Sequence, residues 1–144
     1  MNENTQFCTF RVADLLYGVS VRRVQEVLRF QEMTPVPLAP GAVQGLINLR
    51  GQIVTAVDMR QILQLPDRAD GQKPMNVVVR DGGEAVSLLV DEIGDVIDVD
   101  PEQFESAPET LDDRTRDLVR GVYKLDGRLL LALDIERTLG TVTA

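Results

Sequence analysis

The chain has 144 residues with no histidine, no tryptophan, one cysteine and a formal net charge of -8. An acidic surface with few aromatic side chains argues against binding to nucleic acid or to anionic membranes. The single Cys8 excludes an internal disulfide, and no signal peptide or apolar span of about 18 residues is evident. We therefore expect a cytoplasmic protein without direct membrane insertion.

Two strands are expected first. Residues 7–12 alternate between apolar and polar side chains, and residues 16–20 return after a turn. Cys8 lies in the first strand, where a half-buried position is expected. Valines and a leucine then recur at helical spacing over residues 21–28, which predicts a short helix that closes one end of a barrel.

The remaining elements form a repeated pattern. Segment 43–60 returns as 119–136, at a constant offset of 76 residues, and segment 17–27 returns more faintly as 86–96. Each copy of the first segment has a strand, a tight turn with Gly in second place, a strand, and an Asp placed to cap a short helix. These turn and cap residues are Gly51, Gly127, Asp58 and Asp134. We expect both glycines to have positive φ.

About four strands and a helical turn in each half predict an all-β fold of two small barrels that arose by internal duplication. We expect one domain over residues 1–144, with subdomain one at about 6–68 and subdomain two at about 74–140. Residues 129–133 contain no polar side chain. This pattern predicts a strand covered on both faces, by the other barrel or by a partner.

The sequence offers little for catalysis. Without histidine the chain lacks the commonest general base and metal ligand, and no base accompanies its serines. Carboxylates cluster over residues 91–100 and at 112–113, but their spacing is not that of an EF-hand, so a solvated acidic face is favoured. We expect that the protein is not an enzyme and binds no metal ion or cofactor. The residues favour a non-catalytic binding module. An ion- or small-ligand-binding β-barrel is the alternative, which calorimetry with calcium and common metabolites would distinguish.

Four motifs carry a resemblance to a known family. They are residues 17–27 (Tyr-Gly-Val-Ser-Val-Arg-Arg-Val-Gln-Glu-Val), 34–40 (Thr-Pro-Val-Pro-Leu-Ala-Pro), 43–54 (Val-Gln-Gly-Leu-Ile-Asn-Leu-Arg-Gly-Gln-Ile-Val) and 57–60 (Val-Asp-Met-Arg). Together they resemble the CheW family of bacterial chemotaxis adaptors, over about Phe7 to Leu139. Thr55 and Met59 depart from the Pro and Leu that are usual in the family.

The resemblance implies a fold of two five-stranded SH3-like barrels and a scaffold role in chemotaxis signal transduction. It implies two partners, the cytoplasmic tip of methyl-accepting chemoreceptors and the regulatory domain of the CheA histidine kinase, in receptor arrays at the inner membrane. We expect the free protein to be a monomer. An adaptor in a chemosensory pathway that does not control flagella stays open as an alternative.

The resemblance also implies which residues meet each partner. The receptor groove would include Glu26, Val27, Asn48, Leu49, Arg50, Val86, Leu88 and Val90. The kinase-facing end would include Val24 and Gly45. Arg50 lies at a hairpin turn, and we expect it to pair with the carboxylate of Glu26.

Overall fold

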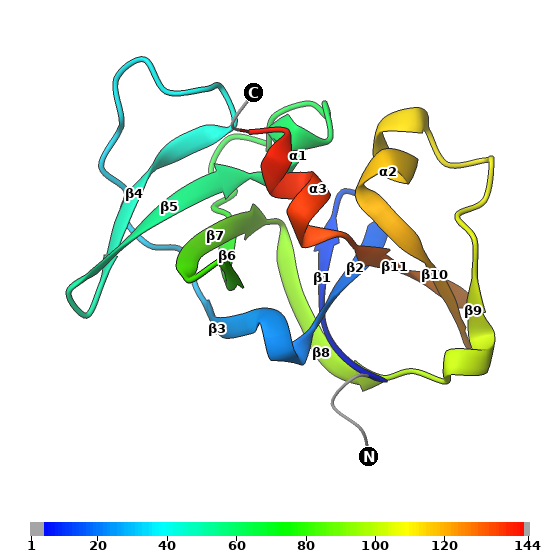
Figure 1. Cartoon of the computed structure of the whole chain (residues 1–144). Coiled ribbons are helices and arrows are strands. Elements are labelled where there is room, and N and C mark those ends of the chain that lie inside the picture. The colour runs from blue at the N-terminus through cyan, green and yellow to red at the C-terminus, as the bar shows by residue number, and fades with distance from the viewer. Residues whose placement is uncertain (1–4, 143–144) are drawn as a thin grey trace.

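The computed structural model describes residues 5–142 and consists of two curled sheets that lie side by side (Figure 1). The strands are β1 Gln6–Val12, β2 Leu15–Ser20, β3 Val24–Leu28, β4 Val43–Leu49, β5 Gln52–Asp58, β6 Met75–Asp81, β7 Glu84–Val90, β8 Glu92–Asp98, β9 Phe104–Glu105, β10 Val119–Leu125 and β11 Arg128–Leu133. The helices are α1 Met59–Ile62, α2 Asp113–Leu118 and α3 Ile135–Gly140. One sheet has the order β8-β1-β2-β11-β10-β9 and the other β3-β6-β7-β5-β4. The predicted all-β fold with short helices is confirmed.

Each sheet closes toward a barrel because the segment that follows one edge strand pairs with a strand at the opposite edge. After β3 the chain returns to β4, where Thr34 and Leu46 exchange backbone hydrogen bonds of 2.9 and 2.8 Å. After β8 the short strand β9 pairs with β10, with Glu105 opposite Val122. Leu46 and Val122 are 76 residues apart, so the two closures are copies of one another. We name the sheet of β3 to β7 the central barrel and the other sheet the N/C barrel.

The two halves of the chain exchange their first hairpins. The β1–β2 hairpin lies in the N/C barrel, whereas its copy, the β6–β7 hairpin, lies in the central barrel. Each exchanged hairpin joins its host sheet through a parallel pair, β2 with β11 and β7 with β5. The expected boundary between residues 68 and 74 therefore separates the two repeats, but each barrel contains strands from both of them.

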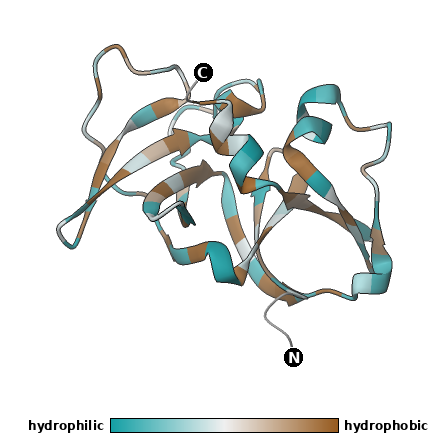
Figure 2. Cartoon of the chain, in the orientation of Figure 1, coloured by the Kyte–Doolittle hydropathy of each residue, from teal (hydrophilic) through white to brown (hydrophobic). Residues whose placement is uncertain are grey.

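The hydrophobic core of the described residues has three parts. The largest lies between the barrels and takes side chains from both sheets. Two smaller clusters fill the interiors of the N/C barrel and the central barrel. Strand β11 serves two of these layers, since Leu130 and Ala132 face the barrel interior while Leu131 and Leu133 face the other barrel. The expectation of cover on both faces is confirmed for residues 130–133, whereas Leu129 is half-buried, and Figure 2 shows this strand as strongly hydrophobic.

The helix predicted over residues 21–28 is wrong. Only Val21–Arg23 form a 3₁₀ turn, and the rest is strand β3, which pairs antiparallel with β6. The register shifts between Val24 and Glu26, which marks a β-bulge. A bulge inserts one residue into the alternation of a strand, so apolar positions fall three apart and imitate helical spacing.

Two aspartates cap short helices, and two glycines lie in the hairpin turns. Asp58 accepts a hydrogen bond of 3.0 Å from the backbone N–H of Arg60 at the start of α1. Asp134 accepts one of 3.0 Å from the N–H of Arg137 at the start of α3. Gly51 and Gly127 have φ of 87° and 77°.

We expect Gly51→Val and Gly127→Val each to lower the free energy of unfolding by about 1–3 kcal/mol, because a β-branched residue is strained at positive φ. Urea titration measures the effect. Gly41→Val is the matched control, since Gly41 does not have positive φ and nothing lies within 4 Å of a Cβ there. Parent-like midpoints for both turn variants would contradict the strained-turn assignment.

Candidate functional site

The tip of the β4–β5 hairpin carries an exposed ion pair. The Arg50 guanidinium contacts the carboxylate of Glu26 on β3, and the two side chains are 71% and 19% exposed. Arg50 itself has φ of 51°, so this residue and Gly51 form a two-residue turn of the type I′ kind. The tight turn therefore holds Arg50 over β3 while most of its side chain stays in solvent.

One further contact lies within the hairpin tip and another joins the tip to β3. Asn48 accepts a hydrogen bond of 2.9 Å from the N–H of Gly51 through its side-chain oxygen, and Gln25 donates one of 3.2 Å to Gln52. Two apolar side chains in this region are exposed, Val27 on β3 at 42% and Ile53 on β5 at 60%. The tip thus presents charged, amide and apolar groups, as a protein-binding surface requires.

A groove of about 410 Å3 lies beside the parallel pair β5–β7 and is closed on one side by the end of α3. Its apolar walls include Val43, Val86, Leu139 and Val142. Three carboxylates line it as well, those of Asp81, Glu84 and Glu136. We name it the acidic groove. The groove and the hairpin tip share strand β5. Thr55 and Val57 line the groove, and Ile53, which belongs to the tip, lies two residues before Thr55.

Glu136 remains a charged group of this groove. Its own backbone N–H, and then the Arg23 guanidinium at 2.8 Å, hold the pKa of Glu136 below its usual range. Glu136 is therefore ionised at neutral pH.

Three residues expected in the receptor groove are not accessible. Leu49 is buried in the interior of the central barrel. Leu88 and Val90 are fully buried in the core between the barrels. They point toward the other barrel, whose strands cover them, and only Val86, near the start of the same strand, lines the open groove. The structure brings together Glu26, Asn48 and Arg50 at the tip.

The two residues expected at the kinase-facing end are also mostly internal. Val24 packs against the core between the barrels. Gly45 is buried, and a Cβ at this position would lie 2.7 Å from the carbonyl oxygen of Thr34. Gly45 is therefore required for the closure of the central barrel. Any effect of this residue on a partner would act through the 33–41 segment that it supports.

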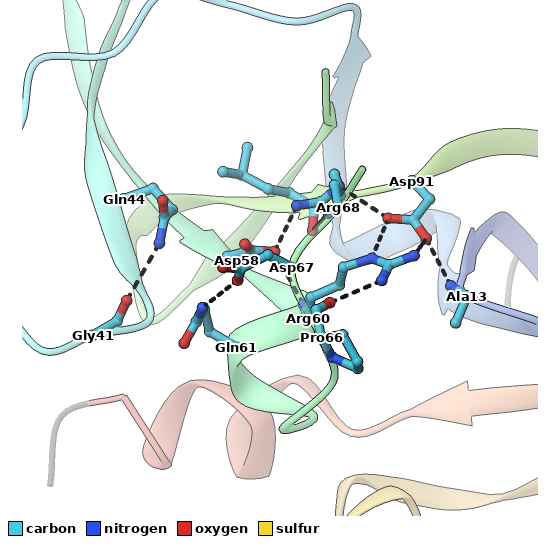
Figure 3. A network of polar contacts seen from close by, with 11 residues as sticks. Ala13, Gly41, Gln44, Asp58, Arg60, Gln61, Pro66, Asp67, Arg68 and Asp91 are labelled. Carbon is cyan, nitrogen blue, oxygen red and sulfur yellow. Dashed lines mark hydrogen bonds and ion pairs between the residues drawn. The ribbon is translucent and has the colours of Figure 1, made fainter. Parts of the chain in front are cut away.

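A buried network of charges lies where the chain passes from the central barrel to the N/C barrel (Figure 3). Asp91, between β7 and β8, accepts hydrogen bonds of 3.0 and 2.7 Å from Arg60 and one of 2.7 Å from the N–H of Ala13. Arg68 donates to Asp58 at 2.9 Å, and its Nε lies 2.9 Å from Asp91 without hydrogen-bond alignment. The side chains of Asp91 and Arg68 are only 7% and 8% exposed. The sequence interpretation missed this network.

The pKa of Asp91 reflects two opposing causes. Burial alone would raise it, but the hydrogen bond from Arg60, the Ala13 N–H and the nearby guanidiniums together hold it below its usual range. Asp91 is therefore an ionised carboxylate that joins three segments of the chain.

Among the described residues, no candidate is found for a metal-binding group or for a membrane-spanning helix. No three His, Cys, Asp or Glu side chains of residues 5–142 gather in a group that could hold a metal ion. No helix within the same range is long and apolar enough to cross a membrane. Cys8 is half-buried in β1 as expected, and burial raises the pKa of its thiol.

Comparison with known proteins identifies the family. The model of the CheW-like domain matches residues 6–142. The chain belongs to the CheW family. Chemotaxis protein CheW of Bacillus subtilis is 32% identical over 130 residues, covering 90% of this chain and 83% of that protein. Chemotaxis protein CheW of Rhizobium meliloti is 29% identical over 135 residues, covering 94% and 87%.

A solved structure in the CheW family has the same fold. The crystal structure of scaffolding protein TtCheW from Thermoanaerobacter tengcongensis superposes with a TM-score of 0.80 at 27% identity, covering 91% of this chain and 89% of that one. The predicted family and its fold of two SH3-like barrels are confirmed over nearly the whole chain.

Proposed function

We propose that the chain is a non-catalytic chemotaxis adaptor that couples the cytoplasmic tips of methyl-accepting chemoreceptors to the regulatory domain of the CheA histidine kinase. Membership of the CheW family over residues 6–142 is the observation that carries this proposal. The names of the relatives support it, since they are chemotaxis proteins and one is a scaffolding protein. In this role the protein works in the cytoplasm, at receptor arrays on the inner membrane.

The receptor-binding surface that we propose has two parts. The first is the hairpin tip with Arg50, Glu26, Asn48 and Val27, and the second is the acidic groove with Val86 on its wall. The apolar side chains would supply the buried area, and the exposed guanidinium would supply orientation and specificity. The kinase would meet the end of the central barrel near the 33–41 segment, which Gly45 holds in place.

Co-sedimentation tests both partners in one experiment. Receptor-containing membranes, CheA and the full chain are mixed and pelleted, with each component omitted in turn. We expect the chain to pellet with receptor membranes, and CheA to pellet in larger amount when the chain is present. If CheA recovery does not depend on the chain, the coupling role is wrong.

We expect Arg50→Asp to leave the fold intact and to weaken receptor binding about tenfold, because the new carboxylate would repel Glu26 and remove the exposed cation. An exposed pair of this kind contributes only about 0–1 kcal/mol to stability. Co-sedimentation and thermal unfolding should be measured on the same preparation.

The matched control for Arg50→Asp is Asp126→Arg, which changes the charge at the corresponding turn of the other hairpin. It should bind receptor membranes like the parent. Unchanged binding of Arg50→Asp would remove the hairpin tip from the proposed surface. A large drop in its melting temperature would make Arg50 a structural residue.

A further inference from the structure

A second groove lies beside the parallel strand pair that the duplication places in the N/C barrel, and it overlaps in part with the copy of the acidic groove. The acidic groove follows the parallel pair β5–β7, in which Thr55 lies opposite Val86. The N/C barrel has the matching parallel pair β11–β2, in which Leu131 lies opposite Tyr17. A groove of about 390 Å3 lies beside this second pair. Its walls come from the β1–β2 turn, β11 and the segment before α2.

The floor of this second groove is made of leucines. Leu15, Leu111 and Leu129 are half-buried, and Leu131 is buried beneath them. The duplication places Leu15 where the acidic groove has Glu84, and Leu131 where it has Thr55. The floor is therefore more apolar than its copy, although it is open to solvent.

The charges around the second groove are inverted relative to the first. Arg11 and Arg128 line it together with Asp14, whereas three carboxylates line the acidic groove. Both arginines are exposed, and among residues 5–142 neither forms an ion pair. We name this site the basic groove. On a chain of net charge -8, two unpaired guanidiniums beside half-buried leucines form a local exception.

We propose that the basic groove docks a short acidic amphipathic segment of a partner protein. The apolar side chains of the segment lie on the leucine floor, and its carboxylates face Arg11 and Arg128. A planar guanidinium can hold a carboxylate through two parallel hydrogen bonds, so the arginines select for acidic residues and fix the register. The volume suits a few side chains rather than a whole domain. This proposal rests on the N/C barrel alone and does not depend on how receptors are bound.

Nuclear magnetic resonance on the full ¹⁵N-labelled chain tests the proposal with three synthetic peptides of equal length. The first has Leu at helical spacing and Glu elsewhere, the second has Lys in place of Glu, and the third has Ser in place of Leu. We expect the Leu/Glu peptide to shift the amide signals of Leu15, Leu111 and Leu129. The Leu/Lys peptide should instead shift signals of the acidic groove, and the Ser/Glu peptide should bind at least about tenfold more weakly than the first.

Variants of the arginines complete the test. Arg11→Glu combined with Arg128→Glu should weaken the Leu/Glu peptide about tenfold or more, without a change in melting temperature. Arg80→Glu is the matched control, because Arg80 occupies the position of Arg11 in the copied hairpin, and it should bind the peptide like the parent. The proposal is overturned if the Leu/Glu peptide gives no shifts at the groove at millimolar concentration, or if the double variant binds it unchanged. If the Ser/Glu peptide binds as tightly as the Leu/Glu peptide, charge attraction alone explains the binding, and this result would also overturn the proposal.

Discussion

Replacing Asp91 with Ala should destabilise the protein by about 3–5 kcal/mol, the cost expected when one partner of a buried ion pair is removed. The Arg60 and Arg68 guanidiniums would lose the carboxylate between them, and the N–H of Ala13 would lose its acceptor. Because these contacts join segments of both barrels, unfolding should remain a single transition with a lower midpoint. Urea denaturation followed by circular dichroism measures the change.

The effect of Asp91→Ala should also depend on pH. The folded-state pKa of Asp91 lies below its ordinary value of 3.8, so its ionised form favours the folded state. The contribution is complete above the unfolded-state pKa and is lost as the pH falls through the lowered folded-state pKa. The difference between parent and variant should therefore shrink below about pH 4. Glu92→Ala, which removes the exposed neighbouring carboxylate, is the control. Equal midpoints for the Asp91 and Glu92 variants at pH 7 would show that the network does not hold the barrels together.

The duplication makes this network one of two related structures. Arg60 on α1 pairs with Asp91 where the chain passes from β7 to β8, and Glu136 on α3 pairs with Arg23 where it passes from β2 to β3. Arg60 and Glu136 are equivalent positions 76 residues apart and carry opposite charges, although their partners are not equivalent, since Arg22 rather than Arg23 is the copy of Asp91. The Arg60 pair is buried and the Arg23 pair is largely exposed. The passage at Asp91 is therefore expected to be the more resistant to local opening.

The sequence predicted the repeated elements because each depends on local chemistry. Gly after a turn residue and Asp before a short helix require particular backbone geometry at single positions, and both copies have it. The exchange of hairpins could not be predicted in this way. A duplicated sequence specifies two identical sets of strands, but it does not specify which copy of a hairpin pairs with which sheet. Only the packing of both halves together decides that.

The candidate site also has features that the local sequence predicted and features that depend on tertiary packing. The Arg50–Glu26 pair followed from a specific motif and its family resemblance, and the structure contains it. Leu88 and Val90 were misplaced because β7 is apolar on both faces, so the sequence does not indicate how far along the strand the cover of the other barrel extends. The sequence did not predict the buried network, because Arg68 lies in the polar segment 67–74, and such a composition is typical of a solvated loop. Asp58 and Arg60, both in the Val57-Asp-Met-Arg60 motif, were the available signals.

Substituting Gly45 with Val should open the central barrel and lower the free energy of unfolding by about 1–3 kcal/mol, as for other insertions into tightly packed sites. A Cβ at Gly45 would lie 2.7 Å from the Thr34 carbonyl oxygen, which is backbone and cannot rotate away. The Thr34–Leu46 hydrogen bonds that close the barrel would have to lengthen or break. The corresponding Gly121→Val should act in the same way on the N/C barrel, because its Cβ would lie 2.7 Å from the Glu105 carbonyl oxygen.

Hydrogen exchange separates a local opening of the barrel from general destabilisation. In Gly45→Val the amides of Thr34 and Leu46 should lose protection well before those of β10, and in Gly121→Val the order should reverse. Gly41→Ala is the control, since a Cβ there meets nothing within 4 Å, and it should leave both closures protected. If Gly45→Val instead exposes both barrels equally, the two closures are not independent. If Gly45→Val leaves the amides of both barrels protected, the close approach of Thr34 does not constrain residue 45. Loss of protection confined to the central barrel would explain how this internal glycine could influence a partner at the 33–41 segment without contacting it.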